Sequence, residues 1–234
     1  MINLINQENL NVNKLFYEDT GMYIDWDQLK KLPAIDTLID IGVGNRGTQN
    51  LYEKFSDQKL ILIDPLDEAE NYAINNLKHR DYTFYKVALG NTKSKKELKI
   101  EKRINRSTFL NVTNINFEAD PVEKRYVEVD LLDNILLDNN SLGRLGIKID
   151  TEGYELDVIL GATKVLKSTK FVIAEVRHNH QSFDSCYKLF QFMEAMNKNA
   201  FQLSMIITAK PFIADLCFQP IKNLEFKSNQ RIFI

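Results

Sequence analysis

Apolar and polar positions alternate along the chain in blocks that predict strands and helices in turn. Several blocks are short continuous apolar runs, which is typical of strands buried on both faces of a parallel sheet. These strand candidates are residues 36–42, 59–64, 82–89, 143–150 and 170–176. Helical stretches separate them, at residues 48–55, 68–76, 154–166 and 183–196. Because strand and helix alternate, the pattern predicts βαβ units in a doubly wound α/β sheet with helices on both faces.

The alternation stops toward the C-terminus. Residues 201–208 and 211–218 are both strand-like, and only a short connection separates them. This pattern predicts a hairpin, so one of the two strands lies antiparallel to the rest of a mostly parallel sheet. Residues 96–102 and 124–130 also break the alternation, and we expect them to be additional strands around a polar loop.

The N-terminal region differs from the remainder of the chain. Residues 1–35 are polar with scattered apolar positions, and residues 23–33 predict a short amphipathic helix that ends at Pro33. We therefore expect residues 1–35 to form a helical extension or lid, and residues 36–234 to form a single domain.

A glycine-rich turn follows the first predicted strand of that domain. Gly42, Gly44 and Gly47 lie between this strand and a predicted helix. Glycines let the main chain approach a ligand, and the N-terminus of the helix favours electron-rich groups. Asp64 ends the second strand, where a carboxylate can accept hydrogen bonds from two ribose hydroxyls. Nicotinamide dinucleotides and S-adenosylmethionine both satisfy this pattern.

Asp40 separates these two ligands, because it lies on the strand just before the glycines. A carboxylate near this turn repels an anionic pyrophosphate, but it suits a ligand that carries an ammonium and a sulfonium. Asp40 therefore favours S-adenosylmethionine. Its alternative role is to hold the backbone of the loop in place, which is compatible with the same ligand.

A second group of acids lies in residues 145–162, "LGIKIDTEGYELDVILGA". Asp150 ends an apolar strand, and Glu152 follows it, so both should face the crevice beyond the carboxyl ends of the strands. Clustered carboxylates raise one another's pKa, which suits a group that accepts a proton near neutral pH. Glu155 lies in the first helical turn, where we expect it to complement the helix dipole.

These motifs, together with "LILIDP", "VALGN", "VEVDLLDNIL" and "FVIAEV", resemble the FkbM family of S-adenosylmethionine-dependent methyltransferases over residues 36–219. The most specific part is the Lys-x-Asp-x-Glu-Gly-x-Glu block that begins at Lys148; Gly44 departs from the usual Ala, and Asp64 from the usual Glu. The resemblance implies a Rossmann-like class I fold with seven strands, and O-methylation of hydroxyls on sugars or glycans. It also places further residues at the cofactor: Asn45, Thr48, Pro65, Ala88 and Leu89.

Methyl transfer to a sugar hydroxyl requires a nearby base or metal, because the hydroxyl is a poor nucleophile at neutral pH. The candidates for the base are Asp150, Glu152, Glu175 and His178, which lie at or after the ends of neighbouring strands. The same acids and histidines offer ligands to a hard divalent cation; a metal is an alternative that we do not expect. Ser107 or Thr108 is a further candidate for the same site. The aromatic residues of the N-terminal segment, Tyr17, Tyr23 and Trp26, either pack in the core, which we favour, or form a lid on which a sugar can stack.

The composition argues against several classes of function. The net charge of −2 argues against broad binding to nucleic acid, although residues 91–106 are basic. The two cysteines have no partner spacing, and no window is long and apolar enough to cross a membrane, so we expect a cytoplasmic protein. The alternatives to the glycan O-methyltransferase are a methyltransferase with a nucleic-acid or protein acceptor, a nicotinamide-dependent oxidoreductase, and a cofactor-binding scaffold without catalysis.

Overall fold

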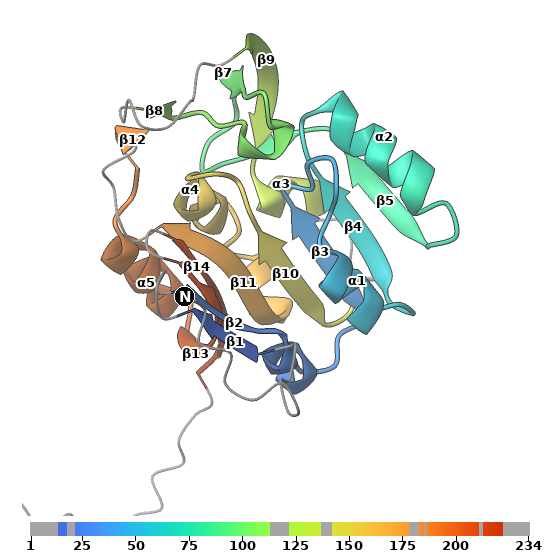
Figure 1. Cartoon of the computed structure of the whole chain (residues 1–234), viewed down its shortest axis with the longest axis vertical. Helices are drawn as coiled ribbons and strands as arrows, with labels where there is room; N and C mark the ends of the chain where they lie inside the picture. The colour runs from blue at the N-terminus through green and yellow to red at the C-terminus, as the bar shows by residue number, and fades with distance from the viewer. Residues whose placement is uncertain are drawn as a thin grey trace, which may run out of the picture.

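The computed structural model describes residues 14–17, 22–112, 122–136, 142–177, 183–184, 186–210 and 213–221. In this part of the chain, nine strands form one central sheet in the order β1-β2-β13-β14-β11-β10-β3-β4-β5 (Figure 1). Its parallel strands are β3 (Thr37–Ile41), β4 (Lys59–Ile63), β5 (Tyr82–Tyr85), β10 (Leu145–Ile149) and β11 (Thr169–Arg177). Its other strands are β1 (Lys14–Tyr17), β2 (Met22–Asp25), β13 (Phe201–Ala209) and β14 (Ile213–Pro220).

The predicted parallel core and C-terminal hairpin are confirmed. β3, β4, β5, β10 and β11 pair in parallel, and β14 pairs antiparallel with both β11 and β13. The predicted number of seven strands is wrong for the described residues, because β1 and β2 extend the sheet beyond β13. β2 pairs with β13 through only two residue pairs, at the end of that strand.

The N-terminal segment therefore contains more strand than the apolar spacing predicts. The helix expected over residues 23–33 is a 3-10 helix, η2 (Trp26–Lys31), which begins only after β2. Leu29 is its buried residue and packs into the core beneath the sheet. The division of the chain at residue 35 stays a prediction.

Helices cover both faces of the sheet, as the alternation predicts. One face packs against α3 (Leu132–Leu136), α4 (Glu155–Leu160) and α5 (Leu189–Lys198), whereas the other packs against η2, α1 (Gln49–Lys54) and α2 (Asp67–Asn76). The strand period of two distributes the side chains between these cores. In β3, for example, Ile39 and Ile41 belong to the first core and Leu38 to the second.

Two helices are shorter than the sequence indicates. The helix predicted over residues 154–166 ends at Leu160, and Val165 and Leu166 lie in a separate 3-10 helix, η4 (Val165–Ser168). The apolar face itself is confirmed, since Val158 and Ile159 are fully buried. The helix predicted over residues 183–196 begins only at Leu189, after the short strand β12 (Phe183–Asp184).

A small second sheet lies apart from the central one, at the top of Figure 1. It contains β6 (Ala88–Leu89), β7 (Ser94–Ile100) and β9 (Glu123–Asp130), so the single strand predicted over residues 82–89 is in fact divided between two sheets. β7 and β9 are the two additional strands that the sequence predicts, and they pair antiparallel. After β7, the chain passes through η3 (Ile104–Arg106) to β8 (Asn111–Val112), which pairs with β12.

Candidate active site

A cavity of about 460 Å³ lies at the carboxyl ends of β3, β4, β10 and β11. Its volume is in the range of small-molecule sites, and its position is where ligands bind in open α/β sheets. The glycine loop and Asp64 form one side. The acids after β10 and β11 form another, and residues 104–109 with β2, η2 and β13 complete the walls.

The glycine loop is pressed against the turn that follows β10. Gly42 has a φ of +82°, and a Cβ at this position would lie 1.8 Å from the carbonyl oxygen of Asp150. Gly44 has a φ of +57°, and a Cβ there would lie 2.5 Å from Oδ1 of Asn105. Only glycine fits such close approaches at a positive φ. The loop therefore brings its backbone to the cavity and also holds the segment that covers it.

Asp64 connects the ends of β3 and β4. Its Oδ2 accepts a hydrogen bond from the backbone N–H of Gly44 at 2.9 Å, and its Oδ1 accepts one from Leu66 at 2.9 Å. Burial raises the pKa of Asp64 to about 6 despite these hydrogen bonds. A carboxylate oxygen can accept more than one hydrogen bond, so Asp64, which lines the cavity, retains the capacity to bind a ligand hydroxyl.

Asp40 lies behind the cavity and outside the residues that line it. Its carboxylate is fully buried and accepts a hydrogen bond from the hydroxyl of Tyr52 in α1. Burial raises the pKa of Asp40 to about 6, although this hydrogen bond and the nearby Lys148 lower it. These contacts favour the alternative role of Asp40, which fixes α1 and the loop, over a direct contact with the positive charges of a ligand.

Most of the other residues predicted at the cofactor line the cavity. They are Gly42, Gly44, Gly47, Thr48, Pro65, Ala88 and Leu89. Asn45 does not; its backbone N–H instead donates a 3.0 Å hydrogen bond to Oδ1 of Asn105. Ser107 lines the cavity, whereas Thr108 is buried beside it and donates a 2.7 Å hydrogen bond to the carbonyl of Glu152.

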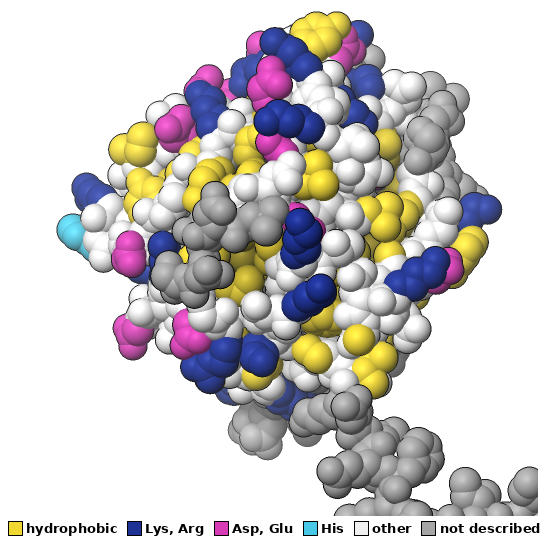
Figure 2. All heavy atoms as spheres, turned by 180° about the vertical axis from the view of Figure 1, so that it is seen from behind, with side chains coloured by type: hydrophobic (Ala, Val, Ile, Leu, Met, Phe, Trp, Pro, Cys, Tyr) yellow, Lys and Arg dark blue, Asp and Glu magenta, His cyan; other side chains and the backbone are white. Residues whose placement is uncertain are grey.

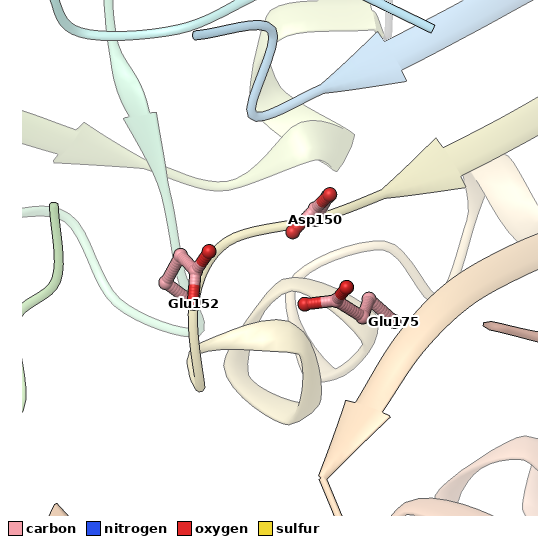
Figure 3. Close-up of side chains that lie close together, drawn as sticks. All are labelled: Asp150, Glu152 and Glu175. Atoms are coloured by element: carbon pink, nitrogen blue, oxygen red, sulfur yellow. The ribbon is translucent and has the colours of Figure 1, made fainter. Parts of the chain in front are cut away.

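Three of the four predicted base candidates converge. Asp150, Glu152 and Glu175 each offer a carboxylate oxygen, and these oxygens lie within 4.8 Å of one another. Figure 3 shows the carboxylates turned toward a common point, with Asp150 and Glu152 on the turn after β10 and Glu175 on β11. All three line the cavity. The fourth candidate, His178, lies outside the described residues.

Neighbouring cations distinguish the three acids. Glu152 forms an ion pair with Arg177, and Asp150 lies 3.6 Å from the ammonium of Lys148. Within the described part of the chain, no group donates a hydrogen bond to the carboxylate of Glu175 and no cation lies in ion-pair contact with it. Burial, with Asp150 as the next cause, raises the pKa of Glu175 to about 8 and that of Glu152 to about 7. Glu175 thus has a proton affinity suited to a base near neutral pH.

Lys148 begins the Lys-x-Asp-x-Glu-Gly-x-Glu block, and its ammonium lies between the carboxylates of Asp150 and Asp215. Its side chain is 7% exposed and its Nζ lies 3.4 Å from Oδ1 of Asp215 on β14. Burial lowers the pKa of Lys148, but Asp150 and Asp215 raise it above its usual value, so the ammonium stays charged. Asp215 in turn accepts a 2.6 Å hydrogen bond from Thr208 on β13. A lone acid in a predicted hairpin strand gives no sequence signal for this contact.

The spacing of the three acids would admit one divalent cation. However, Arg177 and Lys148 already neutralise Glu152 and Asp150. A cation there would have to compete with two built-in positive charges, so the arrangement favours a proton acceptor over a metal site. The metal content stays a prediction.

The sequence predicts that Glu155 complements the helix dipole; in the structure its carboxylate also binds the backbone of the turn before α4. Its side chain is buried, and Oε1 accepts hydrogen bonds from the backbone N–H groups of Thr151 at 2.9 Å and Gly153 at 3.0 Å. Oε2 accepts a 2.8 Å hydrogen bond from the hydroxyl of Tyr187. These bonds hold the turn in which Glu152 adopts a φ of +53°. Glu155 therefore fixes the acid cluster and does not line the cavity.

Sequence comparison supplies the family. The model of the methyltransferase FkbM domain matches residues 29–203. The chain belongs to the FkbM methyltransferase family. This result confirms the resemblance seen in the motifs, and it removes the nicotinamide-dependent oxidoreductase from the alternatives. Membership in the family implies S-adenosylmethionine as the methyl donor. No curated protein matches the sequence.

Solved structures of methyltransferases are similar only distantly. The methyltransferase FkbM from Methylobacillus flagellatus KT is 13% identical with a TM-score of 0.49, covering 79% of this chain and 43% of that chain. A putative S-adenosylmethionine-dependent methyltransferase from Listeria monocytogenes is 13% identical with a TM-score of 0.48, covering 84% of this chain and 98% of that chain. The chain thus spans less than half the length of the Methylobacillus protein.

The cavity fits the methyl donor that the family implies. The backbone of Gly42 and Gly44 lines the cavity, and the buried Asp64 lines the same space. Several side chains there were not predicted: Arg46, Phe109, Lys148, Tyr154, Asp215 and Lys210. Among the helices that the structure describes, none has the length and apolar character needed to span a membrane.

Proposed function

We propose that this chain is an S-adenosylmethionine-dependent O-methyltransferase whose acceptor is a hydroxyl of a small sugar or a glycan, and that Glu175 is its general base. The observation that carries this proposal is the position of Glu175. It lies in the cavity at the end of β11, beside two carboxylates that have their own cationic partners. It therefore combines an available carboxylate with a raised proton affinity.

The cofactor supplies an electrophilic methyl group on a sulfonium when it is bound. Gly42, Gly44 and Asp64 would hold it at the loop end of the cavity. Glu175 would take the proton of the acceptor hydroxyl as that oxygen accepts the methyl group, and the sulfur would leave as a neutral thioether. Because a hydroxyl is a weak nucleophile near neutral pH, removal of this proton contributes directly to the rate. Alignment of the reacting atoms contributes the rest.

A saccharide suits the part of the cavity that β2, η2 and β13 line. Trp26 lines the cavity with 37% of its surface exposed, and Ile24 and Ile207 line it as well. The apolar face of a sugar ring can pack against an indole, while its hydroxyls point toward polar groups. Thr208, Asp215 and Glu175 supply such groups in the same cavity.

The basic segment of residues 91–106 gives little support to a nucleic-acid acceptor. Lys93 and Lys95 on this segment pair with Asp130 at 3.2 Å and Glu128 at 3.7 Å, respectively. Figure 2 shows basic and acidic side chains side by side at the top of the molecule, where β7 and β9 lie. A nucleic-acid backbone binds a surface with an excess of positive charge, and here acids of β9 lie beside two of the lysines.

The test is a panel of acceptors incubated with the full chain and S-adenosylmethionine, with S-adenosylhomocysteine formation as the readout and mass spectrometry to locate the methyl group. The panel contains neutral oligosaccharides, an amine-bearing peptide and single-stranded RNA. We expect product only with saccharides, with the mass increase on a hydroxyl. Methylation of the RNA or of the peptide amine, with none of the saccharides, would overturn the proposal.

A further inference from the structure

The face of the sheet beneath the cavity carries a row of charged residues across four strands. In the registers, Asp40 of β3 is paired with Lys148 of β10, and Glu175 of β11 is paired with Asp215 of β14. Lys148 is also paired with Ile173, which lies two residues before Glu175 and so points to the same face. Lys148 and Asp215 therefore approach Glu175 from the strands on its two sides.

The contacts within this row are tight. The ammonium of Lys148 lies 3.6 Å from Asp150 and 3.4 Å from Asp215. Asp215 is fixed by Thr208, whose hydroxyl donates to Oδ2 and accepts a 3.3 Å hydrogen bond from the backbone N–H of Asp215. Both charges are thus held in place before any substrate binds. Because the site is buried, solvent and salt screen them only weakly.

We propose that Lys148 and Asp215 are positioning residues that act on Glu175 in opposite directions, the lysine weakening and the aspartate strengthening its hold on a proton. This inference rests on the proposed function, because it concerns the base assigned there. Neither residue needs to touch the acceptor. Together they would set the pH at which Glu175 becomes available to take a proton.

Other charged groups act on Glu175 as well, and the balance among them decides the result. The groups that face it are Lys148, Asp150 and Glu152 from β10 and the turn after it, Asp215 from β14, Arg177 from β11 itself, and Lys210, which follows β13 and lines the same cavity. Asp150 and Glu152 also raise the pKa of Glu175. Lys148 lowers the pKa of Glu175, whereas Asp150, Glu152 and Asp215 raise it. Removal of Lys148 therefore leaves the effect of these acids less opposed.

The test is a titration of the Glu175 carboxyl by NMR, on the full chain with ¹³C-labelled glutamate and without cofactor or acceptor. The signal is assigned by its loss in Glu175→Gln. An opposite or like charge at this range shifts a pKa by roughly 1 unit or more. We therefore expect the pKa of Glu175 to rise by about 1 unit in Lys148→Met and to fall by about 1 unit in Asp215→Asn, which is nearly isosteric.

The matched controls make the same charge changes on the exposed hairpin, in Lys124→Met and Glu97→Gln, and should leave the pKa of Glu175 unchanged. Equal or absent shifts in Lys148→Met and Asp215→Asn, or shifts of the same sign, would overturn the inference. If Lys148→Met does not fold, Asp215→Asn decides alone. A fall in the pKa of Glu175 then supports the inference, and any other result contradicts it. The titration needs no acceptor, so it fails or succeeds independently of the acceptor panel.

Discussion

Two regions of this molecule are rich in charge, and they use it differently. On the β7–β9 hairpin, Lys124 pairs with Glu97 at 2.9 Å, and the lysine side chain is 58% exposed. In the cavity, Lys148 pairs with Asp150 and Asp215 at longer distances, but it is 7% exposed. The hydrogen bond from Lys124 lowers the pKa of Glu97, whereas burial raises the pKa of Glu175 to about 8.

The difference shows that burial, more than the distance between charges, decides what a charged pair can do. Exposed charges give up contacts with water when they pair with each other. An exposed pair therefore contributes little to the free energy of unfolding. Buried charges cannot be solvated, so each carboxylate depends on the cations around it. A cluster with more carboxylates than cations has a raised affinity for a proton, and the proposed base uses that affinity to take the proton of the acceptor hydroxyl.

The largest expected effect is the loss of activity when the buried carboxylate of Glu175 is replaced. Glu175→Gln removes the base but keeps the shape of the side chain, so we expect the turnover number to fall by about 10²–10⁴-fold. In the unmodified protein, the rate should rise with pH and level off above about 8, because Glu175 must be deprotonated to act. Steady-state kinetics on the acceptor that the panel identifies, measured from pH 6 to 10, gives both results.

The matched change on the hairpin is Glu97→Gln, which should leave the rate and its pH dependence unaltered. A pH profile that persists unchanged in Glu175→Gln would show that another group takes the proton. In that case Glu152 is the next candidate, because burial raises its pKa to about 7.

A smaller effect is expected on stability. Lys148→Met leaves the partly exposed Asp150 and Asp215 without their shared cation, so we expect the free energy of unfolding to fall by less than the about 3–5 kcal/mol that breaking a fully buried pair costs. Lys124→Met on the hairpin should shift the melting temperature by less than about 2 °C. Urea denaturation followed by circular dichroism compares the two variants. Equal losses of stability would contradict the distinction between the buried and the exposed lysine.

The sequence predicted the parallel core well, because β3, β10 and β11 are short apolar runs that only a doubly covered sheet accommodates. It predicted the acid cluster for the same reason: acids at the ends of neighbouring parallel strands must meet at one edge. The sequence did not predict β2, because four residues are too few to show strand alternation and most of them fall in the helix predicted over residues 23–33; they form a strand by pairing with β1 and with the end of β13.

The contacts that the sequence missed in the site depend on register. Asp40 and Lys148 are charged residues within apolar strands, and nothing local shows which face each one takes or what lies there. Asp215 belongs to a strand more than sixty residues after Lys148, and only the antiparallel insertion of β14 beside β11 brings the two together. Pairing across strands that are distant in sequence is a property of the folded sheet.

The most direct test of the central claim is calorimetric titration of the full chain with S-adenosylhomocysteine, NAD and NADP, repeated on Asp64→Ala. The account predicts that S-adenosylhomocysteine binds, that neither dinucleotide does, and that Asp64→Ala weakens binding by roughly 10-fold or more through loss of charge-assisted hydrogen bonds. Binding of a dinucleotide without binding of S-adenosylhomocysteine would contradict the account.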